Sequence, residues 1–208
     1  YLIASREISI MLKQSLSNLP IEFLTLILYV INPSRCFYRC GKMKIRRDIM
    51  ELLIIRHGQS EADLLDVHEG RADFPLTELG ILQAAKMADY VAEKYPPDVI
   101  LASPLKRASG TAQILHEKIG CDIKFEDDLK EFNNGVLAGL PRKEAAIKYP
   151  LPKGGRPVHI PIPDGESELE FRYRAERIAH KIIHDYKDYK RVAIVSHGGL
   201  ISNFIKSF

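Results

Sequence analysis

The chain lacks several features that would indicate particular classes of protein. It has no uninterrupted run of about 18 apolar residues, so no ordinary membrane-spanning helix is predicted. Its three cysteines are too few for a dense disulfide framework, and we expect a reducing compartment, the cytoplasm. The sequence contains no Walker-type Gly-rich loop and no Asp, Glu and His spacing typical of metal ligands. Neither a metal nor another cofactor is therefore predicted.

The net charge of +3 belongs to one end of the chain. Residues 1–50 carry eight Lys and Arg against three Asp and Glu, which leaves 22 basic and 24 acidic residues for 51–208. The larger part of the chain is therefore slightly acidic, and its charge does not predict nucleic-acid binding.

Residues 1–49 differ in character from the rest of the chain. An apolar run over 23–31 precedes a basic stretch, and as a helix it would span only about 13 Å of a bilayer. We expect 1–49 to be a basic and hydrophobic extension outside the core fold, and 50–208 to be one domain. A peripheral membrane contact or a signal segment stays open as an alternative for the extension. The apolar-periodic segment 198–208 closes the chain without a polar tail, so we expect a fold truncated at its C-terminus.

From residue 50 onward, short apolar runs alternate with amphipathic segments. The apolar runs predict buried strands over 52–55, 99–102, 123–125 and 192–195. The amphipathic segments predict helices over 77–95, 105–119, 142–149, 166–186 and 198–208. Thr77 is expected to cap one helix and Gly120 to end the next. This alternation predicts an α/β fold with three α/β/α layers around a mostly parallel sheet.

Basic and imidazole side chains follow three of these strands. Arg56 and His57 come directly after the first strand, Arg107 lies in the helix turn after the second, and His197 follows the last. Ligands of parallel sheets bind beyond the carboxyl ends of the strands, so these side chains are expected to converge. The glycines after both histidines are expected to let a substrate approach the backbone closely.

Two guanidinium groups that face one point suit a phosphate, because each presents a planar fork of hydrogen-bond donors. A neutral imidazole is a competent nucleophile towards phosphorus, and neighbouring arginine charges disfavour its protonation. The pattern therefore predicts phosphoryl transfer through a phosphohistidine, with a small phosphorylated molecule as the substrate.

Five short segments occur in a fixed order after residue 50. They are Arg56-His57-Gly58-Gln59-Ser60-Glu61, Gly70-Arg71-Ala72-Asp73-Phe74-Pro75-Leu76-Thr77, Ser103-Pro104-Leu105-Lys106-Arg107-Ala108, Gly165-Glu166-Ser167 and Ser196-His197-Gly198-Gly199. Together they resemble the histidine phosphatase (phosphoglycerate mutase-like) superfamily. The resemblance implies that His57 is the phosphorylated nucleophile and that Arg56, Arg107 and His197 surround the phosphate. It also implies that Glu131 donates a proton to the leaving group.

Three further residues, Gln59, Ser60 and Arg71, are candidates for substrate contacts. One position departs from the family pattern: Asp63 stands where many members have an asparagine that helps to hold the phosphate. Because a carboxylate would repel a phosphate, we expect Asp63 to point away or to form a hydrogen bond elsewhere.

The leading interpretation is a metal-independent phosphomonoesterase. A cofactor-dependent phosphoglycerate mutase is the nearest alternative, but such mutases show Glu-Arg-x-Tyr-Gly and Gly-Trp where this chain has Glu131-Phe132-Asn133-Asn134-Gly135 and Gly70-Arg71. A non-catalytic module that binds phosphorylated ligands is the alternative from another functional class.

Overall fold

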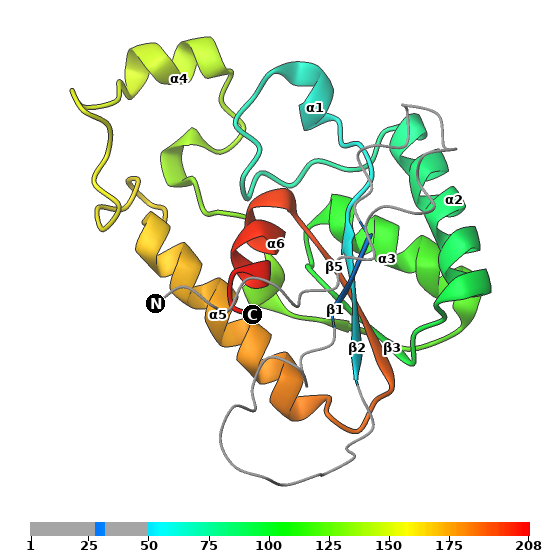
Figure 1. The fold of residues 1–208 in the computed structure, drawn as a ribbon. Helices are drawn as coiled ribbons and strands as arrows, with labels where there is room; N and C mark the ends of the chain where they lie inside the picture. Colours follow the sequence, from blue (N-terminus) through cyan, green and yellow to red (C-terminus); the bar gives the residue numbers. More distant parts are fainter. Residues whose placement is uncertain (1–27, 32–49) are drawn as a thin grey trace, which may run out of the picture.

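The computed structural model describes residues 28–31 and 50–208, which contain one five-stranded sheet (Figure 1). The strands lie in the order β1-β2-β5-β3-β4. Their bounds are β1 Leu28–Ile31, β2 Glu51–Arg56, β3 Val99–Ala102, β4 Ile123–Phe125 and β5 Arg191–Ser196. All pairs are parallel except β1 with β2. The predicted α/β fold with a mostly parallel sheet is confirmed.

Helices connect the strands and cover both faces of the sheet. The helices are α1 Ala62–Leu65, α2 Glu78–Lys94, α3 Lys106–Ile119, α4 Arg142–Lys148, α5 Glu168–Asp185 and α6 Gly198–Ile205. Two short 3-10 helices, η3 (Asp127–Leu129) and η4 (Gly135–Leu137), lie between β4 and α4. Of the helices in the described ranges, none is both long and apolar enough to cross a membrane.

Local signals in the sequence set several helix ends. The Thr77 side chain accepts a hydrogen bond from the Gly80 N–H and caps α2, as predicted. Ser167 and Glu170 form a reciprocal capping box at the start of α5. Gly120 ends α3 with a φ of 84°, a left-handed conformation that glycine adopts without strain.

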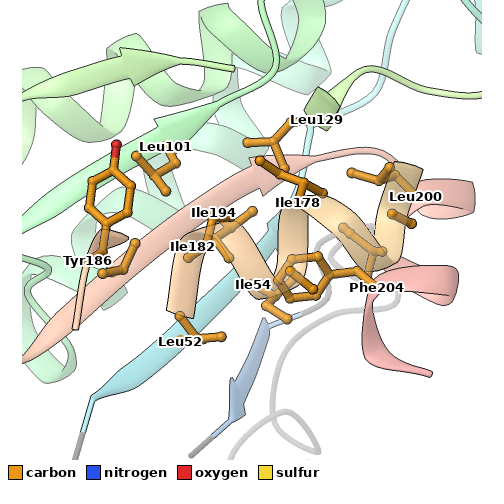
Figure 2. Close-up of a cluster of buried hydrophobic side chains, with 14 of the residues drawn as sticks. Leu52, Ile54, Leu101, Leu129, Ile178, Ile182, Tyr186, Ile194, Leu200 and Phe204 are labelled. Atoms are coloured by element: carbon orange, nitrogen blue, oxygen red, sulfur yellow. The ribbon is translucent and has the colours of Figure 1, made fainter. Parts of the chain in front are cut away.

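The core has two parts because the parallel strands are buried on both faces. Leu52 and Ile54 of β2 pack with α5 and α6, and Figure 2 shows Ile178, Ile182 and Phe204 from those helices against them. The alternate β2 residues, Leu53 and Ile55, point to the other face and pack with α2 and α3. The helices therefore cover both faces of β2, β5 and β3, and the carboxyl ends of these parallel strands lie at one edge.

The edge strand β1 was not predicted. It falls inside the range 1–49 that we expected to lie outside the core fold, and it pairs with β2 with Leu28 opposite Ile55. The other edge of β2 is bonded to β5, so β1 supplies backbone partners for the free edge. The sequence pattern of an apolar run does not identify the strand with which it pairs. The remainder of 1–49 lies outside the described residues, and the boundary at residue 50 stays a prediction.

Candidate active site

The carboxyl ends of three neighbouring strands bring the predicted site residues together. Arg56 ends β2 directly opposite Ser196, which ends β5, so His57 and His197 follow at equivalent positions. Their ring centroids lie 5.0 Å apart, close enough for both rings to contact one phosphoryl group. Arg107 joins them from the first turn of α3, and all three side chains are buried. Directly beyond these strand ends, the chain continues into α1 after β2, into α3 after β3 and into α6 after β5 (Figure 1).

One hydrogen bond determines which nitrogen of His57 is free to react. His57 Nδ1 lies 2.7 Å from the carbonyl oxygen of Gly58, which can only accept, so Nδ1 carries the proton. The lone pair is then on Nε2, which lies 3.3 Å from Arg107 Nε. Burial, followed by the positive charge of Arg107, lowers the pKa of His57 from 6.5 to about 3. His57 is therefore a neutral imidazole at neutral pH, and its Nε2 lone pair faces Arg107, from which it accepts a hydrogen bond.

The backbone after His57 is fixed from two sides. The Gly58 N–H donates to Thr111 Oγ1 on α3, at 3.2 Å. A Cβ at Gly58 would lie only 2.4 Å from the Gly80 carbonyl oxygen at the start of α2. We expected a glycine at this position so that a substrate could approach the backbone. The structure gives a different reason for the glycine: the backbone of α2 leaves no room for a side chain.

Arg107 is held in place by the loop between α1 and α2. Its Nη1 donates to the Ala72 carbonyl at 2.9 Å, and its Nη2 donates to the Gly70 carbonyl at 2.7 Å. Its Nε faces both His57 and the carboxylate of Glu69, whose Oε1 lies 3.2 Å away. The guanidinium therefore keeps a fixed orientation beside the reactive imidazole.

Two buried nitrogens in this cluster have no hydrogen-bond partner among the described residues, Arg56 Nε and His197 Nδ1. His197 Nε2 lies 2.8 Å from the Ser103 hydroxyl, which itself accepts a hydrogen bond from the Leu105 N–H. The hydroxyl is thus able to donate to Nε2, which leaves the ring proton on Nδ1. Burial first, and then His57 and Arg107, hold the pKa of His197 well below 6.5. A bound oxyanion would satisfy both nitrogens.

The Glu131 carboxylate reaches the same edge from the loop after η3. Its Oε2 accepts a hydrogen bond of 2.9 Å from the Gly199 N–H in the first turn of α6, and its Oε1 accepts one of 2.8 Å from Phe132. The Leu129 carbonyl nearby accepts a hydrogen bond of 2.7 Å from Ser196 Oγ. The end of β5 and the start of α6 therefore fix the position of this carboxylate.

Arg174 on α5 holds the same loop from the other side. Its Nη1 donates to the carbonyls of Asp128 and Lys130, both at 2.8 Å, and its Nη2 donates to that of Glu131 at 3.2 Å. It also forms a bidentate pair with Glu166. The Arg174 side chain is 9% exposed, so these hydrogen bonds are largely shielded from water.

Comparison with known proteins identifies the family. The model of the histidine phosphatase superfamily (branch 1) matches residues 52–208. The chain belongs to this superfamily. It is 34% identical over 148 residues to the uncharacterized phosphatase PhoE of Bacillus subtilis (strain 168), covering 71% of this chain and 72% of that protein.

Two further similar proteins are also phosphatases. A metal-independent phosphoserine phosphatase of Arabidopsis thaliana is 30% identical over 176 residues, which cover 82% of this chain and 74% of the relative. The crystal structure of the alpha-ribazole phosphatase from Shigella flexneri superposes with a TM-score of 0.66 at 27% identity, covering 73% of this chain and 75% of that chain. The present chain is accordingly a phosphatase of the histidine phosphatase type.

In this phosphatase, the candidate substrate ligands lie around the cluster. Gln59 Oε1 accepts a hydrogen bond of 2.8 Å from Thr77 Oγ1 at the start of α2. Arg71 Nε donates to the Glu131 carbonyl at 3.4 Å. Ser60 donates from its N–H to Asp63 Oδ2 at 2.8 Å, so Asp63 forms a hydrogen bond elsewhere, one of the two expected outcomes. Contacts of Gln59, Ser60 and Arg71 with a substrate stay predictions.

Two residues of the cluster were missed by the sequence analysis. Arg174 interrupts the apolar stripe that Phe171, Ala175 and Ile178 form on α5, and a charged residue in such a stripe is a usable signal. Glu69 lies in a loop without periodicity, so nothing in the sequence separates it from a solvent-exposed acid. Among the described residues, no three His, Cys, Asp or Glu side chains gather as metal ligands do.

Proposed function

We propose that this phosphatase hydrolyses small phosphomonoesters in two steps, with His57 as the nucleophile and without a metal ion. The observation that carries the proposal is the orientation of His57. Its Nδ1–H donates to the Gly58 carbonyl, which leaves the Nε2 lone pair directed towards the guanidinium group of Arg107. A nucleophile whose other nitrogen is fixed needs no reorientation before it attacks.

In the first step, His57 Nε2 attacks the phosphorus atom of the substrate. A P–N bond forms, the bond from phosphorus to the ester oxygen breaks, and protonated Glu131 donates its proton to the leaving alkoxide. The hydrogen bonds that Gly199 and Phe132 donate to the Glu131 carboxyl oxygens support this role, because they fix the donor at the edge of the site.

In the second step, the Glu131 carboxylate accepts a proton from a water molecule, which attacks the phosphohistidine. The P–N bond breaks, and inorganic phosphate and neutral His57 are released. Arg56, Arg107 and His197 would stabilise the charge on the equatorial oxygens in both steps. The unpartnered Arg56 Nε and His197 Nδ1 support this assignment, since each offers a position for one oxygen.

The proposed substrate class is a small phosphorylated metabolite. The phosphoserine phosphatase and the alpha-ribazole phosphatase among the similar proteins support this choice. The proposed compartment is the cytoplasm, which the low cysteine content supports. The phosphatase domain would comprise residues 50–208 together with β1, and the rest of the range 1–49 would be an extension.

Hydrolysis of p-nitrophenyl phosphate in excess EDTA tests the proposal. We expect the wild type to be active, His57→Ala to be inactive, and the exposed-histidine control His159→Ala to match the wild type. A phosphoenzyme that is stable in base and labile in acid should accumulate in the wild type. Metal dependence, or an active His57→Ala variant, would contradict the mechanism. Transfer between 3- and 2-phosphoglycerate would instead identify the mutase alternative.

A further inference from the structure

Glu69 and the proposed nucleophile, His57, both lie next to the same nitrogen of Arg107, Nε. Glu69 Oε1 lies 3.2 Å from Arg107 Nε, and His57 Nε2 lies 3.3 Å from the same nitrogen. The same carboxyl oxygen accepts a short hydrogen bond from Ser60 Oγ. The carboxylate is therefore held against the cation that the proposed function assigns to phosphate binding.

The other nitrogens of Arg107 also have hydrogen-bond partners in the protein. One N–H of Nη1 and one of Nη2 are already committed to the carbonyls of Ala72 and Gly70. Nε carries a single proton, which it donates to His57 Nε2, while the Glu69 carboxylate forms an ion pair with the same nitrogen. A phosphoryl group bound beside His57 would thus meet a second negative charge on the same guanidinium.

We propose that the Glu69 carboxylate competes with the substrate's phosphoryl group for Arg107, and that Glu69 thereby sets the affinity and pH dependence of substrate binding. The inference rests on the proposed function, since it takes Arg107 to be a phosphate ligand. When the Glu69 carboxyl group is ionised, it neutralises Arg107 and repels the phosphoryl dianion. When it is protonated, it adds no charge and can donate a hydrogen bond to a phosphoryl oxygen.

The groups that face Glu69 decide the direction of the pH dependence. They are Arg107 from α3, Ser60 and Asp63 from the segment around α1, and Glu131 from the loop after η3. Burial is the largest effect and raises the pKa of Glu69. Arg107 and Ser60 oppose the increase, whereas Asp63 and Glu131 add to it. Anion affinity is therefore expected to fall as the pH rises through the pKa of this carboxyl group.

A purely supporting role for Glu69 makes the opposite prediction. If the carboxylate only held Arg107 in position, removal of its charge would loosen the guanidinium and weaken anion binding. The isosteric substitution Glu69→Gln keeps a hydrogen-bond acceptor next to Arg107 while it removes the charge. The two roles therefore differ in the sign of the effect, not only in its size.

Sulfate binding to the full chain, measured by calorimetry at about pH 5 and about pH 8, distinguishes them. Sulfate remains a dianion over this range, so its own ionisation does not contribute. We expect Glu69→Gln to bind sulfate about tenfold or more tightly than the wild type at the higher pH, and the difference to shrink at the lower pH. The matched control is Glu61→Gln, which removes an exposed carboxylate near α1 and should bind as the wild type does.

The kinetic counterpart is a KM for p-nitrophenyl phosphate that falls in Glu69→Gln at the higher pH, with kcat nearly unchanged. Equal or weaker sulfate binding by Glu69→Gln would overturn the inference, while an active wild type would leave the proposed function intact. A wild type that neither hydrolyses the ester nor binds sulfate would overturn both. If Glu69→Gln does not fold, the wild type still decides, because an unchanged sulfate affinity between the two pH values contradicts competition.

Discussion

The Glu131 carboxylate accepts a hydrogen bond from the backbone N–H of Gly199, with 2.9 Å between Oε2 and the nitrogen. The two residues are 68 positions apart in sequence and meet because β5 delivers α6 to the edge of the sheet that the loop after η3 crosses. The absence of a side chain at Gly199 is required for this contact, because a Cβ there would lie 2.5 Å from Glu131 Oε1. The position of the proposed proton donor therefore depends on a glycine of another element.

The substitution Gly199→Ala should move Glu131 without removing it. We expect kcat for an alkyl phosphate to fall about tenfold to a hundredfold, since a misplaced general acid loses most of its contribution. The free energy of unfolding should change little, because the displaced group is the end of a flexible side chain. The matched control is Gly110→Ala on α3, where a Cβ would make an ordinary contact of 3.4 Å with Leu76. Unchanged turnover by Gly199→Ala would argue against Glu131 as the donor.

Arg174 should act on catalysis through the Glu131 loop. The substitution Arg174→Gln removes the hydrogen bonds to three carbonyls and leaves Glu166 without its bidentate partner. We expect a loss of about 3 kcal/mol in the free energy of unfolding, which urea denaturation would measure. Arg172→Gln, an exposed arginine on the same helix, should cost much less.

A second measurement on Arg174→Gln shows whether Arg174 positions Glu131 or only stabilises the fold. A misplaced Glu131 should slow the hydrolysis of alkyl phosphates, whose leaving group needs a proton, far more than that of p-nitrophenyl phosphate. Equal losses with both substrates would mean that Arg174 affects the fold alone.

The fold was predictable because its elements have strong local signals. The runs at 52–55, 99–102 and 192–195 are apolar on both faces, which is typical of strands covered on both sides. The convergence of His57 and His197 then followed from the rule that parallel strands share a carboxyl edge. Each of these inferences used only the neighbouring sequence and one general property of α/β sheets.

What could not be predicted depends on tertiary placement. The pairing of β1 with β2 is set by an unpaired edge that the sequence does not display. The reason for Gly58 lies in the backbone of α2, 22 positions further along the chain. Glu69 is significant only because the loop after α1 folds back towards Arg107. Such contacts arise from loops, whose course is not encoded by periodicity.

The burial of His57 makes protein stability depend on pH. Its pKa is lowered to about 3 in the folded protein, whereas in the unfolded chain it returns to its ordinary value of 6.5. Between these values the unfolded chain binds a proton that the folded protein does not, so acidification favours unfolding. The stability that neutral His57 contributes is fully present above about pH 6.5. It declines by about 1.4 kcal/mol for each pH unit below that value.

The substitution His57→Gln should remove this dependence. In urea denaturation between about pH 7 and about pH 4, the free energy of unfolding of the wild type should fall more steeply than that of His57→Gln. The difference between them should grow to about 3 kcal/mol at the acidic end. His159→Gln, which alters an exposed histidine, should keep the wild-type slope. Parallel slopes for the wild type and His57→Gln would mean that His57 accepts a proton in the folded protein near its ordinary pKa. The imidazole would then lose its Nε2 lone pair in mildly acidic solution, and the phosphatase should show a matching loss of kcat below about pH 6.5.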